Sequence, residues 1–244
     1  MLQNTFCHVP MITVAAENAL WNSGIHSWHD CVGLNPIALA PHKLRNLQRY
    51  VRQSFEELGR GNPNYFCSLL PSNQHWRLFR EFRTSAAYLD IETTGLGDHA
   101  TDHITTIALY DGTTITHYVH GQNLQQFPQD IRKFRILITY NGKCFDIPFI
   151  PRYFGLTLTA AQIDLRYVLR SLGYRGGLKG CERQIGVERE ELEDVDGYFA
   201  VLLWNEFKRS GNRKALETLL AYNIADVVNL ETLMVLAYNM KIRE

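Results

Sequence analysis

Four carboxylates and one tyrosine lie within or beside apolar segments that we expect to form a protein core. They are Asp90, Glu92, Asp146, Tyr222 and Asp226. Burying several like charges together costs free energy unless a cation neutralises them. Divalent cations are the simplest such partners, and a pair of cations held by carboxylates is suited to the hydrolysis of phosphodiester bonds. The residue types therefore indicate metal-dependent phosphodiester chemistry.

The first pair, Asp90 and Glu92, occupies the end of a predicted strand. Residues two apart on a strand project from the same face of the sheet. The sequence Thr93-Thr94-Gly95 follows and ends the strand, so both carboxylates should lie near the edge of the sheet. Such a pair is common on surface strands. Here the surrounding residues 86–91 are mostly apolar, which is typical of a strand buried on both faces.

The remaining members lie on predicted helices. Asp146 opens a helix after a tight Asn141-Gly142 turn, and taken alone this position favours a capping role. Tyr222 and Asp226 are four residues apart on the last helix and share one face. A tyrosine with this spacing is more often a core residue than a catalyst. Asp226, in contrast, is a charged residue within the apolar run Leu219–Leu236. A purely structural role does not explain a carboxylate at this position.

In combination, the motifs resemble those of the DEDD superfamily of 3′→5′ exonucleases, which have a ribonuclease-H-like fold. Asp90-Ile91-Glu92 matches the first motif, Asn141-x3-Phe145-Asp146 the second, and Tyr222-x3-Asp226 the tyrosine (DEDDy) version of the third. The similarity covers about residues 64–240 and is greatest to the bacterial YprB-like group. The segments that support this grouping are Trp76-Arg77-Leu78, residues 88–96, Leu178-Lys179-Gly180-Cys181-Glu182 and residues 219–223.

The resemblance implies a site with two Mg²⁺ or Mn²⁺ ions. Asp90, Glu92 and Asp226 would bind one ion, which lowers the pKa of a bound water. Asp90 would also contact a second ion about 4 Å from the first, which stabilises the leaving oxygen. Asp146 would contact metal-bound water or complete the second site. Tyr222 would orient the attacking water, because a tyrosine with a pKa of about 10 is a poor base at neutral pH.

Further residues are candidates for contacts with the substrate. Asn141 would contact the strand or cap a helix, and Phe145 would stack on a base or pack in the core. Thr93 follows the first metal motif directly. Lys179 carries a cation that suits a phosphate, although a solvated helix face explains it equally well. Asp164, after the last predicted strand, is favoured as a structural residue.

Composition bounds the class of protein. The chain has 244 residues with 25 basic and 25 acidic side chains, so its net charge alone does not indicate a nucleic-acid binder. Basic residues recur in 43–52, 77–83 and 166–183, which would suit a phosphate backbone, although charge alone favours solvated helix faces. Five scattered cysteines without a CxxC pair fit a reducing compartment. We expect a cytoplasmic protein with no membrane contact and no signal peptide.

From residue 86 the pattern changes from helices to strands. We expect strands over 86–91, 103–110, 113–120, 135–140 and 160–164, with a two-residue hairpin turn at Asp111-Gly112. Predicted helices cover 145–154, 165–172, 178–185, 194–209 and 213–240. This order predicts an α/β protein with a ribonuclease-H-like mixed five-stranded sheet, flanked by helices, and the first strand at its centre.

The N-terminal part is predicted to be helical. Residues 1–33 resemble a helix-hairpin-helix, a module whose hairpin amides contact phosphates. The hairpin reads Pro10-Met11-Ile12-Thr13 and lacks the expected glycines, so a packing role is at least as well supported as nucleic-acid binding. Residues 34–85 form a helical connector packed on the main domain, with a helix over 43–58 that Gly59–Pro63 ends. We expect the exonuclease domain to cover residues 86–244.

The sequence therefore predicts a metal-dependent 3′→5′ exonuclease acting on single-stranded ends of DNA or RNA. A DNA-processing protein is a candidate partner. The alternative is a non-catalytic module that binds nucleic acid or a protein partner on the same fold. Degenerate nucleases usually lose one or more metal ligands. This chain retains all four carboxylates and the tyrosine, which favours the enzyme.

Overall fold

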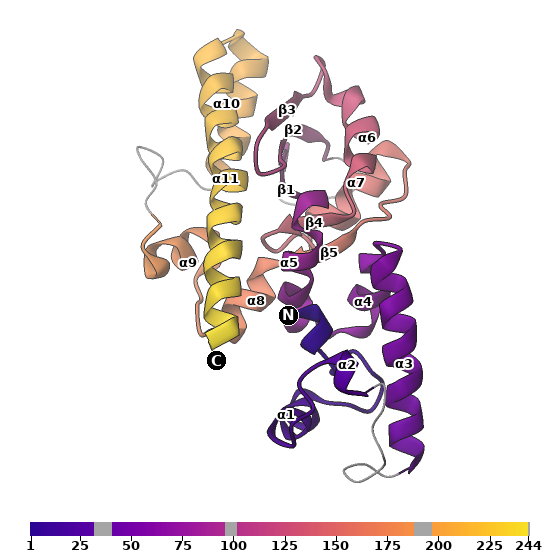
Figure 1. The fold of residues 1–244 in the computed structure, drawn as a ribbon. Coiled ribbons are helices and arrows are strands. Elements are labelled where there is room, and N and C mark those ends of the chain that lie inside the picture. Colours follow the sequence, from indigo (N-terminus) through magenta and orange to yellow (C-terminus); the bar gives the residue numbers. More distant parts are fainter. Residues whose placement is uncertain (32–40, 96–101, 188–196, 244) are drawn as a thin grey trace. The chain divides into compact units, whose positions relative to one another are not determined.

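The computed structural model describes residues 1–31, 41–95, 102–187 and 197–243. The chain forms two compact units, Met1–Arg83 and Thr84–Glu244 (Figure 1). A short 3₁₀ turn, η3 (Arg83–Ser85), spans the boundary. The predicted boundary between residues 33 and 34 lies outside the described residues, so the division of the first unit into two parts stays a prediction.

The second unit contains the mixed five-stranded sheet that the sequence predicts. Its strands are β1 (Ala86–Thr93), β2 (Ile104–Tyr110), β3 (Ile115–Val119), β4 (Ile136–Thr139) and β5 (Ala161–Asp164). The spatial order is β3-β2-β1-β4-β5, with β1 antiparallel to β2 and parallel to β4. The fold class and the central position of β1 are thereby confirmed.

The β2–β3 hairpin differs from the prediction of a two-residue turn. Strand β3 begins at Ile115, so the loop covers residues 111–114. The carboxylate of Asp111 accepts hydrogen bonds from the backbone N–H groups of Thr113 (2.9 Å) and Thr114 (2.7 Å). These N–H groups are therefore satisfied by a side chain within the turn, and the ladder starts later.

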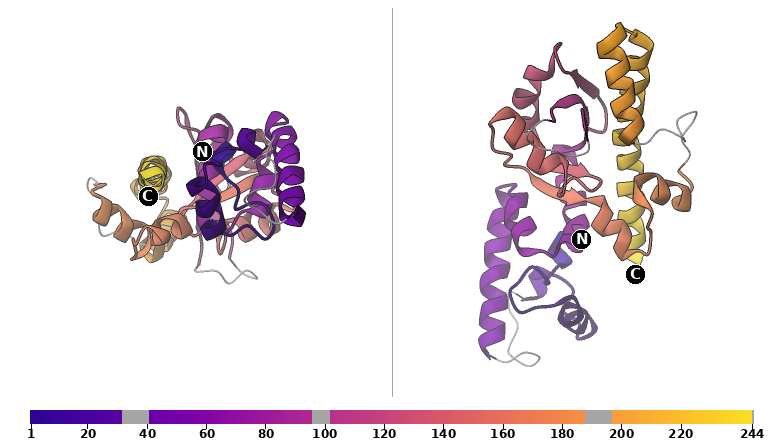
Figure 2. Two further views of the ribbon diagram at one scale, coloured as in Figure 1. Left: turned by 60° about the horizontal axis from the view of Figure 1, so that its bottom comes forward. Right: turned by 180° about the vertical axis from the view of Figure 1, so that it is seen from behind.

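Helices cover both faces of the sheet (Figures 1 and 2). The helices of this unit are α6 (Phe127–Asp130), α7 (Asp146–Phe154), α8 (Leu165–Ser171), α9 (Gly177–Ile185), α10 (Gly197–Ser210) and α11 (Arg213–Arg243), with 3₁₀ turns η4 (Leu124–Gln126) and η5 (Ile131–Lys133). The main core joins Leu89 of β1 to Phe127 of α6 and Phe149 of α7. On the opposite face, Leu219 of α11 packs with Trp204 of α10.

Helix α11 is the longest element, and its length and apolar composition would also suit a membrane span. Its buried side chains include Leu219, Val227 and Leu233, and the helix packs against β1 and β2. We therefore assign α11 as a core helix of the second unit.

The first unit is helical. Its elements are η1 (Leu2–Asn4), α1 (Val14–Asn22), α2 (Trp28–Cys31), α3 (Pro41–Gly59), α4 (Pro63–Leu69), η2 (Ser72–Leu78) and α5 (Phe79–Phe82). Trp28 and Phe66 stack in its core, with ring centroids 5.8 Å apart. A buried ion pair, Glu17 to Arg77 at 2.7 Å, joins α1 to η2. Glu17 also accepts a hydrogen bond from the N–H of Cys7, and this contact offsets part of the cost of burying its charge.

Candidate metal centre

Strand β1 and helix α11 bring three of the predicted ligands together. One carboxylate oxygen from each of Asp90, Glu92 and Asp226 lies within 4.8 Å of the other two. Alternation along β1 directs Ala87, Leu89 and Ile91 into the main core, so Asp90 and Glu92 project from the face that α11 covers. The pairing of β1 with β2 shifts register after Glu92, which places the site at the end of regular pairing.

The electrostatics of this cluster are unfavourable without a cation. Burial, and then the charges of Asp226 and Glu92, raise the pKa of Asp90 well above its usual range. Burial, and then the charge of Asp226, raise the pKa of Glu92 in the same way. The carboxyl groups therefore retain protons at pH values where exposed ones would be ionised. A divalent cation that binds here would displace those protons.

Asp146 lies beside the cluster at the first residue of α7 and is buried. Its Oδ1 accepts a hydrogen bond from the N–H of Ile91 (3.2 Å), the residue between Asp90 and Glu92. Burial raises the pKa of Asp146 to about 7, although its backbone hydrogen bonds lower it. Through its hydrogen bond with Ile91, the Asp146 side chain ties the start of α7 to β1.

Tyr222 lies one turn before Asp226 on α11 and lines the same cavity. Its side chain is largely buried, with 7% of the residue exposed. The Nζ of Lys179, on α9, lies 5.2 Å from the centroid of the Tyr222 ring. The structure thus brings Tyr222 to the cavity of the acidic cluster and places the Lys179 cation over the Tyr222 ring.

Asn223 belongs to this site but was not predicted from the sequence. Its Nδ2 donates to the carboxylate of Asp90 (2.6 Å) and to the carbonyl oxygen of Asp90 (3.2 Å). Asn223 is fully buried, so it links α11 to β1 in the interior. An amide inside an apolar helix is the signal that would have found it, by the same reasoning that selected Asp226.

The loop between β4 and α7 is held by Asp164. This buried carboxylate accepts hydrogen bonds from the N–H of Asn141 (2.8 Å) and of Lys143 (3.1 Å), and it caps α8 through the N–H of Arg166 (3.0 Å). The structural role predicted for Asp164 is confirmed. Asn141 adopts a left-handed backbone with φ of 62°, and its side-chain oxygen accepts a hydrogen bond from Arg166.

A cavity of about 700 Å³ opens onto the acids. Asp90, Glu92 and Asp226 line it together with Tyr222 and Asn141, and three exposed arginines contribute positive charge: Arg166, Arg170 and Arg175. These arginines come from the basic stretch 166–183. An acidic floor with a cationic rim can bind metal ions and phosphates together.

Phe145 and Thr93, two of the predicted substrate contacts, lie outside the lining of this cavity. The ring of Phe145 packs against the main core and lies 5.8 Å from that of Phe149. The Thr93 side chain is buried, and its hydroxyl donates to the carbonyl oxygen of Gly95 (2.5 Å). Neither residue is among those that line the cavity. Their contacts with a substrate stay predictions.

The donor set fits a hard divalent cation. Three carboxylates supply only oxygen atoms, which suit Mg²⁺, Mn²⁺ or Ca²⁺ better than softer metals. The spacing of the oxygens lets one ion reach all three after small side-chain adjustments. Such an ion would also remove the mutual repulsion that raises the pKa values of the cluster.

A comparison with protein families agrees with this fold. A family model described as the RNase_H superfamily matches residues 87–238, which is more than half of the chain. The protein therefore belongs to the RNase_H superfamily. No curated protein matches the sequence. Among solved structures, the chain is similar to the family B DNA polymerase from the hyperthermophilic archaeon Pyrobaculum calidifontis, with a TM-score of 0.49 and 17% identity over 64% of this chain and 24% of the polymerase.

Proposed function

We propose that this protein is a metal-dependent 3′→5′ exonuclease of the DEDDy type, most similar to the YprB-like group, that hydrolyses single-stranded ends of DNA or RNA. The observation that carries the proposal is the meeting of Asp90, Glu92 and Asp226 within 4.8 Å in an RNase_H superfamily domain. None of the five cysteines, which all lie in the described part of the chain, forms a disulfide, and this suits the cytoplasmic location that we also propose.

Two Mg²⁺ or Mn²⁺ ions are the proposed cofactors. Asp90, Glu92 and Asp226 would hold the first ion, and Asp90 with Asp146 would hold the second. When bound, the ions would supply an activated water and stabilise the leaving oxygen. Asn223 fixes the orientation of the Asp90 carboxylate through its hydrogen bond, which keeps this shared ligand in place.

The remaining residues would position the strand and the attacking water. The hydroxyl of Tyr222 would orient the water by a hydrogen bond. The exposed guanidinium groups of Arg166, Arg170 and Arg175 would pair with phosphates of the strand as it enters the cavity. Lys179 beside Tyr222 would add to this countercharge.

The test is an assay on a 5′-labelled single strand, of DNA or of RNA, with Mn²⁺ or Mg²⁺ and analysis on a denaturing gel. We expect a ladder of products shortened from the 3′ end, which EDTA abolishes. Asp90→Asn should lower the rate about a thousandfold or more, because a lost metal ligand costs several kcal/mol of transition-state stabilisation. The control Glu217→Gln, an exposed acid on α11, should keep the wild-type rate.

Two results would contradict the proposal. Products cut internally or from the 5′ end would overturn the assigned direction. A strand that stays intact with every metal, while the protein still binds it, would favour the non-catalytic binding module.

A further inference from the structure

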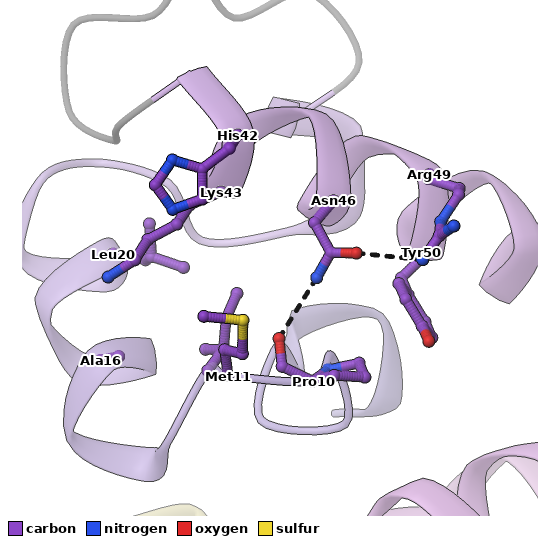
Figure 3. Close-up of a pocket in the computed structure, with 10 residues that line it drawn as sticks. Pro10, Met11, Ala16, Leu20, His42, Lys43, Asn46, Arg49 and Tyr50 are labelled. Atoms are coloured by element: carbon purple, nitrogen blue, oxygen red, sulfur yellow. Dashed lines mark hydrogen bonds between the residues drawn. The ribbon is translucent and has the colours of Figure 1, made fainter.

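The first unit contains a pocket of about 370 Å³ that is separate from the acidic cluster (Figure 3). It lies between the hairpin at Pro10–Ile12, helix α1 and the first half of α3. Met11, Ala16 and Leu20 supply apolar surface, and Tyr50 supplies an aromatic ring. This volume and this mixture of apolar and polar groups are typical of a site for a small molecule or a single chemical group.

The charge around the pocket has one sign. Lys43 and Arg49 line it and are exposed, and none of its described lining residues is acidic. Residues 41–52 of α3 carry no carboxylate, and Arg45 and Arg52, which are also exposed there, do not line the pocket. Because the whole chain has no net charge, this positive surface is local and favours an anionic occupant.

The backbone conformation of Met11 and the exposure of its side chain are not explained by packing in the core. Its φ is 74°, a left-handed conformation that side chains other than glycine rarely adopt, and 74% of the residue is exposed. The hairpin is fixed to α3, since the Nδ2 of Asn46 donates to the carbonyl of Pro10 (3.2 Å). Asn46 also accepts a hydrogen bond from Arg49 (3.1 Å), so the same amide orients a cation. Strained residues of this kind concentrate at binding sites.

We propose that this pocket binds one nucleotide of a single-stranded nucleic acid. The base lies against Met11 and the ring of Tyr50, while Lys43 and Arg49 pair with the flanking phosphates. Bases stack on aromatic side chains irrespective of sequence, and methionine adapts to varied surfaces. The contacts come from side chains of α3 and from the Met11 side chain, rather than from glycine amides of the hairpin. It goes beyond the proposed hydrolysis, because it assigns the first unit a binding site of its own.

The first experiment measures binding of fluorescently labelled single-stranded DNA and RNA to the full chain by anisotropy in EDTA. The double variant Lys43→Ala/Arg49→Ala should weaken binding about tenfold or more, and the slope of log affinity against log salt should decrease by about 0.7 for each lost phosphate contact. The matched control, Arg45→Ala/Arg52→Ala, removes the same charge from α3 outside the pocket and should change binding less than about twofold. An equal loss of affinity in both double variants would contradict binding in the pocket and would indicate non-specific electrostatic attraction to α3.

A second variant separates binding from folding. Met11→Gly removes the exposed side chain and relaxes the left-handed backbone, so the melting temperature should stay the same or rise. Strand binding should nevertheless weaken. In addition, a strand that carries 5-iodouracil should form a photocrosslink to a peptide that contains Met11 or Tyr50.

Unchanged binding in both pocket variants, or crosslinks only to the second unit, would overturn the proposal. If those variants instead lost binding to poly-glutamate, the pocket would be assigned to an acidic protein partner. Because binding is measured in EDTA, failure of this proposal is distinguishable from failure of the proposed hydrolysis.

Discussion

At the scale of single residues, Asn223 has a role that its neutral side chain conceals. It donates two hydrogen bonds to Asp90, one to the carboxylate and one to the backbone. A carboxylate among other carboxylates would turn away from them in the absence of a cation. The amide opposes this by holding Asp90 in place, and the same hydrogen bond lowers the pKa that burial and neighbouring charges raise.

Replacement of Asn223 by alanine should therefore weaken Mn²⁺ binding and lower the nuclease rate, each by about 10- to 100-fold, as is typical for residues that orient metal ligands. Isothermal titration with Mn²⁺ and initial rates measure the two effects. Asn229→Ala is the control, since Asn229 lies on the same helix but donates to Glu182 (3.0 Å). Equal Mn²⁺ affinity in wild type and Asn223→Ala would remove this role from Asn223.

At the scale of elements, the loop that follows β4 determines where α7 begins and so where Asp146 lies. Gly142 is buried in this loop, and a Cβ there would lie 2.8 Å or less from three side-chain atoms of Thr139. Asp164 holds the neighbouring N–H groups, which leaves the loop little freedom to move away.

Gly142→Ala should accordingly lower the free energy of unfolding by about 1–3 kcal/mol, the usual cost of overpacking, and reduce the nuclease rate. Urea denaturation and initial rates provide the measurements. Gly59→Ala is the control, because a Cβ at Gly59 meets no atom within 4 Å. Wild-type stability in Gly142→Ala would mean that the loop adjusts freely.

A buried histidine gives the first unit a pH-dependent stability. The Nε2 of His8 lies 2.8 Å from the Oγ of Ser54, which connects the N-terminal hairpin to α3. Burial, and then the charge of Arg77, lower the pKa of His8 from 6.5 to about 3. Between these values the unfolded chain binds the proton and the folded chain does not. Stability from this group is thus complete above pH 6.5 and is lost as the pH falls toward 3.

Chemical denaturation at pH 7 and pH 5 should show this loss, with a slope of at most about 1.4 kcal/mol per pH unit from His8. His8→Phe keeps an aromatic ring but cannot titrate, so its stability should depend less on pH over this range. An identical pH dependence in the variant would assign the acid sensitivity to other groups.

At the scale of the whole molecule, the acidic cluster that the nuclease activity requires should lower the stability of the metal-free protein. Asp226→Asn removes one of the like charges that raise the pKa values of Asp90 and Glu92. Without metal, the variant should unfold at a higher temperature than the wild type at pH 8, yet it should have lost nuclease activity.

Mn²⁺ should reverse this order. At a concentration 100 times its Kd, the ion stabilises the wild type by about 2.7 kcal/mol. It should have little effect on Asp226→Asn, and Glu217→Gln should respond to Mn²⁺ like the wild type. Thermal unfolding with EDTA and with Mn²⁺ makes the comparison. A metal-free Asp226→Asn that is less stable than the wild type would contradict the electrostatic account.

Much of the second unit was predictable because its signals are local. The central position of β1 is predicted because its neighbours in the sheet come from both halves of the pattern, the hairpin strands and the strands that alternate with helices. Asp226 is identified because a charge in an apolar helix needs a partner. Asn223 lies inside the same motif, directly after Tyr222, but a neutral amide gives a weaker signal. Its contact with Asp90 joins residues 133 positions apart, which no local pattern reveals.

Other features were not predicted because the same residues are compatible with two structural interpretations. Asn62 and Pro63 were interpreted only as the end of α3. The Asn62 side chain in fact accepts a hydrogen bond from the N–H of Asn64 and begins α4, with Pro63 at its first position. The three arginines that line the acidic cavity lay within a recognised basic stretch. Only the packing of α8 and its following loop distinguishes them from solvated neighbours.

The most direct test of the metal centre is an anomalous diffraction map from crystals of the protein soaked in Mn²⁺. We predict a peak bound by carboxylate oxygens of Asp90, Glu92 and Asp226, and a second peak between Asp90 and Asp146. Loss of the first peak is expected in Asp226→Asn crystals. A map from wild-type crystals with no peak at these carboxylates, or with manganese bound only elsewhere, would contradict the account.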